Sequence, residues 1–213
     1  MLKRVFGVRR RDGVPHEELV DAWRDEHIPN VVRDLAPDHY AVTFFRQREG
    51  TPFDGMAVLT FDDADRGRAA WAPTDPPKGC FRDALTERAA PRAFVFDATE
   101  HVQVDGPRGP FKSVSFVAKR PGTSMEAFVR HWLDVHAPNV VGAASGLGDG
   151  FRYVVSVGEG LADDAPYHGI AELYYADREA WKAHGRALGP DGFETVAVLR
   201  PEATMLGEEV HVR

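Results

Sequence analysis

Two stretches of this chain repeat each other at a fixed spacing. Residues 23–32 read WRDEHIPNVV, and residues 132–141 read WLDVHAPNVV. At an offset of 109 residues the run 2–32 aligns with the run 111–141 without a gap and is identical at 14 of 31 positions. Unrelated stretches of that length would agree at roughly two positions, so a repeat must be considered before any other feature. We therefore expect two copies of one unit, each large enough to be a domain rather than a short solenoid repeat.

The repeat also sets the expected domain boundaries. The first domain is predicted at residues 1–104, a linker rich in Pro and Gly at 105–110, and the second domain at 111–213. Hydrophobic patterning predicts the order β-α-β-β-α-β in each copy. Each first helix carries the repeated motif and is expected to end close to its histidine, because a proline follows two residues later. The predicted strands are 2–9, 39–46, 53–61 and 95–104, then 111–118, 151–157, 167–175 and 204–212, and the predicted second helices are 63–71 and 177–184.

A four-stranded sheet with both helices on one face leaves its other face bare, and burial of apolar area is the main source of stability. Two copies in one chain can cover each other. The expected fold is therefore α+β, with two ferredoxin-like domains packed sheet to sheet as a pseudo-dimeric α/β barrel. This would be a monomer with an internal pseudo-dimer, and a higher homo-oligomer stays open.

Composition narrows the function classes. The 213 residues are 43% hydrophobic, which is enough for a sizeable core. A formal net charge of −7 argues against a nucleic-acid partner. Cys80 is the only cysteine, so no internal disulfide can form and a reducing compartment is expected. No apolar run suits a signal peptide or a membrane span, so we expect a cytoplasmic protein without a membrane partner.

The repeated histidines are the first candidates for chemistry. His27 follows Trp23 by four residues, as His136 follows Trp132, so each histidine shares a helical stripe with large apolar residues and is expected to face the core. A histidine near a helix end and among apolar neighbours can act as a general acid or base near neutral pH. The alternative is that each ring caps a free helix carbonyl.

Glu172 is the second candidate. Strand alternation places it on the same face as Ile170 and Tyr174, so a carboxylate lies among apolar neighbours. Such burial raises the pKa of a carboxyl group toward a catalytic range. If Glu172 shared a cavity with His136, the two would form a pair that only the second copy could build, since the first has Val58 there. The alternative is a structural salt bridge, for example to Arg152.

Other polar and aromatic side chains are candidates for substrate binding. The tyrosines could donate to a carbonyl or phenol, or simply pack in the core. The asparagines after the helix prolines could polarise a substrate oxygen or bind backbone carbonyls. Asp54 and His168 occupy corresponding positions in the two copies and could reach the rim of a pocket. Trp132 is more typical of a core residue. These candidates are Tyr153, Tyr40, Tyr167, Asn139, Asn30, Trp132, His168 and Asp54.

The motifs together resemble the EthD-type members of the dimeric α/β barrel superfamily. The second half carries KRPGTSMEAF, HWLDVHAP and YHGIAELYY, and the first half keeps RRRDG, AWRDEHIP and FDGMAVLTF. Asn30 and Asn139 depart from the apolar residue that the family has there. The resemblance implies ferredoxin-like domains with a pocket between helices and sheet. Its relatives include cofactor-independent dehydratases, cyclases, isomerases and monooxygenases acting on aromatic or polyketide-like molecules, and haem-using cousins.

We therefore expect a cofactor-independent enzyme of the lyase, isomerase or cyclase type, acting in biosynthesis or degradation. In this hypothesis His136, with Glu172 and His27, moves a proton on a hydrophobic aromatic or polyketide-like molecule. The alternatives are a cofactor-free or haem-dependent monooxygenase, with His27 or His136 as axial ligand, and a non-catalytic binding protein. A metal-ion site is not expected, because the closest histidine pair, His131 and His136, lies on different helix faces. Substrate, reaction type and the number of active half-pockets stay open.

Overall fold

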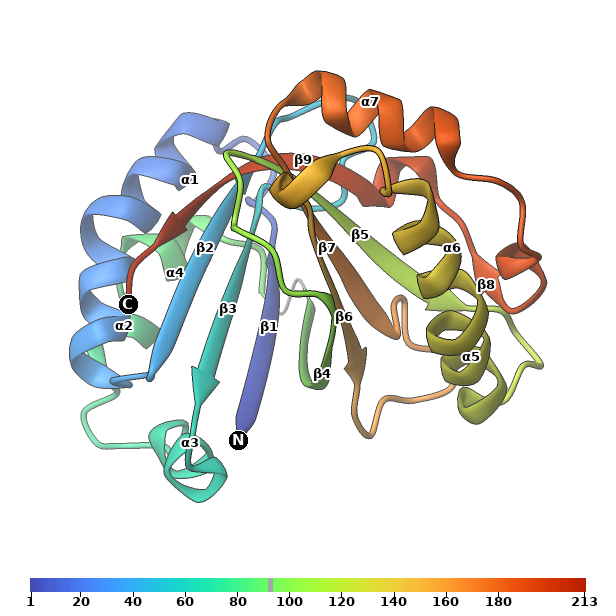
Figure 1. The fold of residues 1–213 in the computed structure, drawn as a ribbon. Helices are drawn as coiled ribbons and strands as arrows, with labels where there is room; N and C mark the ends of the chain where they lie inside the picture. The colour runs from blue at the N-terminus through green and yellow to red at the C-terminus, as the bar shows by residue number, and fades with distance from the viewer. Residues whose placement is uncertain (92–93) are drawn as a thin grey trace. The chain divides into compact units, whose positions relative to one another are not determined.

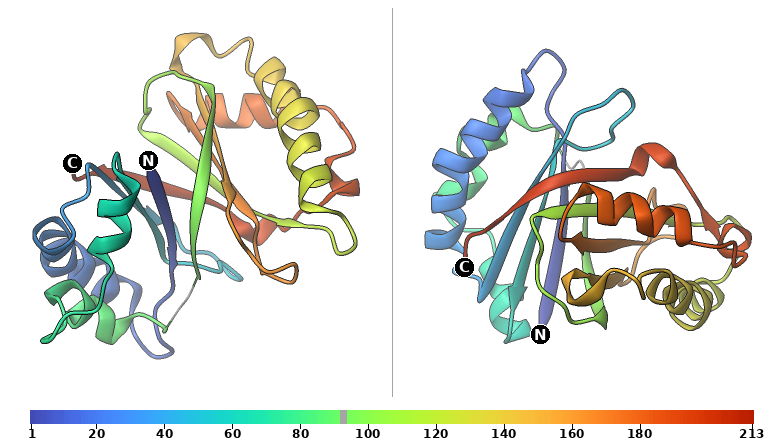
Figure 2. Two further views of the ribbon diagram at one scale, coloured as in Figure 1. Left: turned by 90° about the horizontal axis from the view of Figure 1, so that it is seen from below. Right: turned by 45° about the horizontal axis from the view of Figure 1, so that its top comes forward.

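The computed structural model describes residues 1–91 and 94–213. Its contacts divide the chain into two compact units, residues 1–98 with 209–213 and residues 99–208. The first unit thus ends before the expected position 104, and the C-terminal residues belong to the first unit rather than the second. In each unit the helices lie on one side of the strands (Figures 1 and 2).

The first unit is built on antiparallel strand pairs. β1 pairs with β3 on one side and with β4 on the other, and β2 pairs with the far side of β3. In the β1–β3 pair, Leu2 lies opposite Phe61. The strands are β1 (Leu2–Val8), β2 (His39–Phe45), β3 (Gly55–Phe61) and β4 (Phe94–Val104). The helices are α1 (His16–Ala22), the π-helical turn η1 (Trp23–His27), α2 (Ile28–Asp34), α3 (Ala64–Ala70), the 3₁₀ turn η2 (Gly79–Phe81) and α4 (Ala84–Arg88).

The second unit has a corresponding set of elements. β7 pairs with β5 and β6, and β9 and the short β8 pair with β5, all antiparallel. The strands are β5 (Phe111–Lys119), β6 (Arg152–Gly158), β7 (Gly169–Tyr175), β8 (Ala197–Val198) and β9 (Thr204–His211). The helices are α5 (Met125–His131), the π-helical turn η3 (Trp132–His136), α6 (Ala137–Ala143), α7 (Arg178–Ala187) and the 3₁₀ turns η4 (Gly148–Gly150), η5 (Phe193–Thr195) and η6 (Pro201–Ala203).

The predicted pair of ferredoxin-like domains packed sheet to sheet is wrong. Hydrogen bonds join the strands into one sheet in the order β7-β6-β4-β1-β3-β2-β9-β5-β8, and a further β7–β5 pairing connects the ends of the eight-strand run. β4, with 11 residues, pairs with both β1 and β6, and β9 with both β2 and β5. The backbone groups at the edges of the strands in each unit are therefore paired by hydrogen bonds, and such pairing is the most complete way to remove an exposed edge. Residue patterning shows which face of a strand is apolar, but not which strand continues past its own unit.

Each motif helix continues past its histidine, contrary to expectation. The backbone N–H of Ile28 donates to the carbonyl of Trp23, and that of Ala137 to Trp132, so both helices make a π turn before the proline. The wider turn separates the proline ring from the carbonyl that an α-helix would bring against it. The helix therefore resumes at α2 and α6, and each histidine lies inside a helix at a π turn, a feature frequent at functional sites.

The two tryptophans of the motif are core residues, as the apolar stripe predicts. Trp23 and Trp132 are 1% and 0% exposed. Each indole lies against a strand glycine: a Cβ added at Gly55 would lie 2.7 Å from Trp23, and one at Gly169 would lie 3.0 Å from Trp132. Glycine is required there because the ring occupies the space of a side chain. This close packing fixes the helix on its sheet and so sets the position of the histidine one turn later.

No helix within the described part of the chain has both the length and the apolar character needed to cross a bilayer.

Candidate functional site

A cavity of about 350 Å³ lies inside the second unit. This is within the range of small-molecule sites, roughly 300–1,000 Å³. Its wall is mostly apolar and includes side chains from η3, from β5 and β7, and from the segment after α7. Polar groups reach it from Ser115, His136, His184, Arg200 and Thr204.

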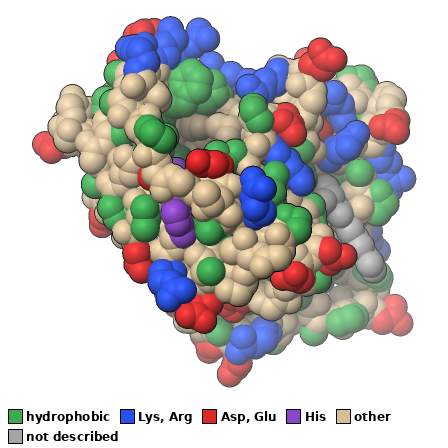
Figure 3. All heavy atoms as spheres, turned by 90° about the vertical axis from the view of Figure 1, so that its right-hand side faces the viewer, with side chains coloured by type: hydrophobic (Ala, Val, Ile, Leu, Met, Phe, Trp, Pro, Cys, Tyr) green, Lys and Arg blue, Asp and Glu red, His purple; other side chains and the backbone are tan. Residues whose placement is uncertain are grey.

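His136 is held on this cavity wall by two contacts. Its Nδ1 lies 2.7 Å from Oδ2 of Asp191, and its ring stacks on Phe193 with centroids 4.0 Å apart. Burial lowers the pKa of His136 and outweighs the opposing effect of Asp191. The ring is therefore neutral at pH 7, with its proton on Nδ1 facing the carboxylate and a lone pair on Nε2. Figure 3 draws the side of the molecule on which α5 and α6 lie in Figure 1, and histidine side chains are visible on this surface.

Asp191 is itself fixed by several donors. Asn139 Nδ2 donates to Oδ2 of Asp191 at 2.7 Å and to the carbonyl of Gly189 at 2.8 Å, and the backbone N–H of Phe193 donates to Oδ1 at 3.0 Å. Burial disfavours the charged carboxylate, but the hydrogen bonds from Asn139, His136 and Phe193 lower its pKa overall. Asn139 thus positions the carboxylate that positions the imidazole, and it also bonds a backbone carbonyl, as one of the two alternatives for this residue expected.

The first unit contains the same arrangement beside a cavity of about 370 Å³. His27 Nδ1 lies 2.8 Å from Oδ2 of Asp83, and Asn30 Nδ2 donates to the same oxygen at 3.1 Å. The backbone N–H of Thr86 donates to Oδ1 at 3.2 Å. Although burial opposes it, these contacts lower the pKa of Asp83 to about 2. Each unit therefore has a His-Asp-Asn cluster, which we call the first cluster (His27, Asp83, Asn30) and the second cluster (His136, Asp191, Asn139).

The two aspartates were missed by sequence reasoning. Asp83 follows GCFR and Asp191 follows LGP, so the surrounding residues share no motif. The available signal was their separation of 108 residues, one less than the repeat offset. A search for acidic residues at nearly the repeat spacing would have found them.

Glu172 does not share the cavity of His136. The cavity is lined by Ala171, Leu173 and Tyr175, which alternate onto the opposite face of β7. The Glu172 carboxylate accepts from Lys112 Nζ at 2.8 Å and from the Tyr174 hydroxyl at 3.4 Å. The salt-bridge alternative has the right chemistry but the wrong partner, because Arg152 instead pairs with Asp105.

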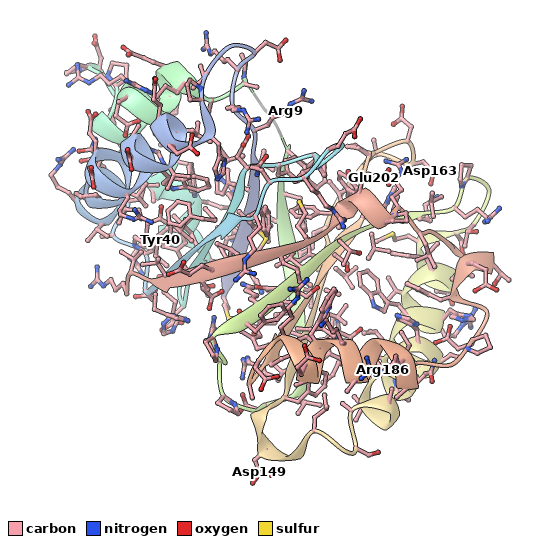
Figure 4. The ribbon with its side chains drawn as sticks, turned by 90° about the horizontal axis from the view of Figure 1, so that it is seen from above. Arg9, Tyr40, Asp149, Asp163, Arg186 and Glu202 are labelled. Atoms are coloured by element: carbon pink, nitrogen blue, oxygen red, sulfur yellow. The ribbon has the colours of Figure 1, made fainter. Side chains whose placement is uncertain are left out.

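The tyrosines of the two cavities are buried, protonated phenols. Tyr40 lies on β2 and lines the first cavity (Figure 4), and Tyr153 lies on β6 and lines the second. Burial raises the pKa of both hydroxyls. Trp132 also lines the second cavity, and its Nε1 donates to the Tyr153 hydroxyl at 3.3 Å.

The remaining candidates lie elsewhere. Tyr167 packs against Phe116 with centroids 5.3 Å apart. His168 Nδ1 accepts from the backbone N–H of Lys119 at 3.2 Å, and Asp54 Oδ2 accepts from that of Arg10 at 2.7 Å. Since Arg10 and Lys119 are repeat partners, Asp54 and His168 make equivalent contacts to the backbone. Neither His168 nor Tyr167 lines either cluster's cavity.

His184 is a second imidazole on the wall of the second cavity that the sequence did not single out. Its Nδ1 bonds the Tyr175 hydroxyl at 2.7 Å, and its Nε2 donates to the carbonyl of Val140 at 2.9 Å. Both ring nitrogens of His184 therefore have hydrogen-bond partners. In His136, Nδ1 has a partner, and Nε2 has none among the described residues. Of the two rings, His136 alone can offer a nitrogen to a ligand without breaking a hydrogen bond.

Acid should destabilise the second unit in a defined window. Burial lowers the pKa of His136, His168 and His184 below 6.5. As the pH falls below about 6.5, the unfolded chain takes up protons that the folded chain does not, so the free energy of unfolding decreases. Urea unfolding at pH 7.5, 6.0 and 5.0 measures this loss. His184→Phe should reduce the slope, and equal stability at pH 7.5 and 5.0 would refute the prediction.

Comparison with solved structures defines the fold of this chain, which is similar to that of chlorite dismutases. A chlorite dismutase variant from Candidatus Nitrospira defluvii in complex with cyanide has a TM-score of 0.62 and 12% identity, covering 99% of this chain and 91% of that chain. A heme-binding protein from Thermus thermophilus has a TM-score of 0.58 and 15% identity, with coverage of 99% and 91%. At these identities the likeness establishes the fold.

Residues 120–191 match the model of the EthD domain family, which confirms the resemblance recognised in KRPGTSMEAF, HWLDVHAP and YHGIAELYY. Comparison with curated protein sequences gives no match.

These findings correct the expected function. The prediction of a cofactor-independent lyase, isomerase or cyclase is wrong, because the structural neighbours are chlorite dismutases and a heme-binding protein. The prediction that no cofactor is needed is wrong for the same reason. The Glu172–His136 pair, which the proton-transfer hypothesis offered as a possible addition to His136, is not formed, because Glu172 pairs with Lys112 and His136 with Asp191.

Proposed function

We propose that this protein binds haem in the cavity of the second unit, where Nε2 of His136 would bind the iron. The observation that supports this most is the second cluster: an imidazole on the wall of an apolar cavity, bonded through Nδ1 to a carboxylate, with no hydrogen-bond partner at Nε2 among the described residues. Metal-ligating histidines almost always donate their other ring N–H to such a partner, which fixes the tautomer and increases the basicity of the ligating nitrogen.

The rest of the cavity suits the same group. Its mostly apolar wall suits an apolar ring system, and Arg200 is one of the lining residues, so that its guanidinium, 5.7 Å from the ring centroid of Tyr167, could pair with a carboxylate of the ligand. Burial keeps His136 neutral, and the neutral imidazole is the form that ligates a metal.

Other side chains of the cavity are poorer ligands. His184 has both nitrogens engaged. Burial raises the pKa of the Tyr153 and Tyr175 hydroxyls, so neither forms the phenolate that iron would require. His136 is thus the one ligand that needs no rearrangement.

Haem would supply redox chemistry at its iron, so the enzymatic form of this proposal is a haem-dependent oxidoreductase. The chain's own groups have separate roles. Asp191 holds the Nδ1 proton of His136, and Asn139 holds Asp191. The hydroxyls of Ser115 and Thr204, bonded to each other at 2.9 Å, provide a polar point on the lining that can exchange a proton with a bound molecule.

Titration of the haem-free protein with haemin tests the proposal. We expect a Soret band that saturates, and His136→Ala should lose the tightest binding step. His131→Ala is the matched control, because its ring is on the same helix and also stacks near Phe193, at 6.0 Å, yet does not line the cavity. Circular dichroism checks that both variants fold. A His136→Ala protein that binds haemin as tightly as the parent would exclude this site.

A further inference from the structure

We infer that the first unit holds a second haem on His27, so that one chain carries two. This inference rests on the proposed function of the second cluster and extends it to the first. It answers a question that the sequence leaves open, namely whether one half-pocket is active or both.

The first cluster reproduces the features on which the proposal for the second depends. In both, the imidazole comes from the last residue of a π turn, its Nδ1 bonds Oδ2 of an aspartate, and an asparagine bonds the same oxygen. In both, Oδ1 of that aspartate accepts a backbone N–H. The cavities measure about 370 and 350 Å³. Within the described residues, Nε2 of His27 has no hydrogen-bond partner.

The two aspartates arrive on different segments. Asp83 stands between η2 and α4 and caps α4, whereas Asp191 lies in the turn before η5. These segments share no sequence motif, yet each places a carboxylate within 2.8 Å of the imidazole Nδ1. Capping of α4 could explain the position of Asp83, but it does not explain that of Asp191, which lies in a turn and still bonds the histidine of its own unit. Orientation of the imidazole is therefore the property common to both aspartates.

Among the described residues that line the first cavity, no other side chain competes with His27 as an iron ligand. Burial raises the pKa of the Cys80 thiol to about 12 and also raises that of the Tyr40 hydroxyl, so both stay protonated. The ring of Trp71 packs between Phe6 and Phe81, at 5.3 and 5.7 Å, and provides an aromatic wall for a planar ligand.

The two sites should differ in affinity. The lining of the second cavity includes Arg200, which can pair with a ligand carboxylate, whereas the described lining of the first includes neither lysine nor arginine. Charge-assisted hydrogen bonds are roughly twice as strong as neutral ones. The first site is therefore expected to fill after the second.

Counting bound haem tests this inference. After saturation with haemin and removal of the excess by gel filtration, haem is measured as its pyridine complex and divided by the protein concentration. We expect two haems per chain for the parent, one for His27→Ala, one for His136→Ala and none for the double variant. In the titration, His27→Ala should lose the weaker step and His136→Ala the tighter one. Cys80→Ser is the matched control in the first cavity and should still bind two.

Each result has a distinct meaning. One haem in the parent, unchanged by His27→Ala and lost in His136→Ala, would overturn this inference and leave the proposed function intact. Two haems in a folded His27→Ala protein would also overturn it, because the second haem would then lie elsewhere. No haem in the parent would overturn both proposals. Near-ultraviolet circular dichroism of each variant shows whether the aromatic core is retained.

Discussion

Lys112→Met is expected to lower the free energy of unfolding by about 3–5 kcal/mol. The ammonium of Lys112 and the carboxylate of Glu172 lie 2.8 Å apart, with side chains 1% and 6% exposed. The same ammonium lies 4.8 Å from the ring centroid of Tyr174. Lys112→Met removes the ammonium that lies 2.8 Å from this buried carboxylate, and breaking a buried ion pair costs more than the net value of the pair.

Urea unfolding at pH 7 measures this loss. Lys112→Met combined with Glu172→Met should recover most of the stability, since a well-packed apolar pair can replace a buried ion pair. Lys182→Met is the control: Lys182 forms a pair of similar length, 2.7 Å, with Glu179, but on the surface, so little change is expected. A Lys112→Met protein as stable as the parent would show that Glu172 is balanced by other groups.

Trp132→Ala is expected to cost about 3–5 kcal/mol of stability and to weaken haem binding at the second cluster. The indole is fully buried and packs against Phe128 and Phe193, with centroids 5.2 and 5.7 Å apart. Because Phe193 stacks directly on His136, a cavity at Trp132 removes the support of the imidazole as well as core contacts. A ligand held less firmly binds metal less tightly.

Thermal unfolding and haemin titration measure the two effects together. Trp23→Ala is the matched control, because it removes the equivalent core tryptophan of the first unit, which is 1% exposed. It should cost similar stability without weakening the tight haem step. Equal weakening of that step in both variants would mean that loss of stability alone, rather than the Trp132–Phe193–His136 contact, accounts for the change.

Several parts of the site were predictable from local sequence. The 109-residue offset identified His27 and His136 as equivalent, and the helical stripe showed that both face inward. Alternation in YHGIAELYY identified Glu172 as a buried carboxylate, which it is at 5% exposure. These inferences succeed because helical and strand periodicities are properties of neighbouring residues.

The contacts between distant residues were not predictable in this way. Asp83 reaches His27 across 56 residues, and Asp191 reaches His136 across 55. Alternation separated Glu172 from Ala171, Leu173 and Tyr175, but it could not show which of the two faces borders the cavity of His136. The conditional expectation of a Glu172–His136 pair was wrong for that reason.

By itself the sequence determined the repeat, the main strands of each half, the start of each motif helix and the inward direction of both imidazoles, because these depend on spacing along the chain. Only the tertiary structure decided that the strands join into one sheet, that Lys112 neutralises Glu172, and that an aspartate orients each histidine. Edge pairing and ion pairing depend on which distant segments meet, and that is set by the packing of the whole chain rather than by any local pattern.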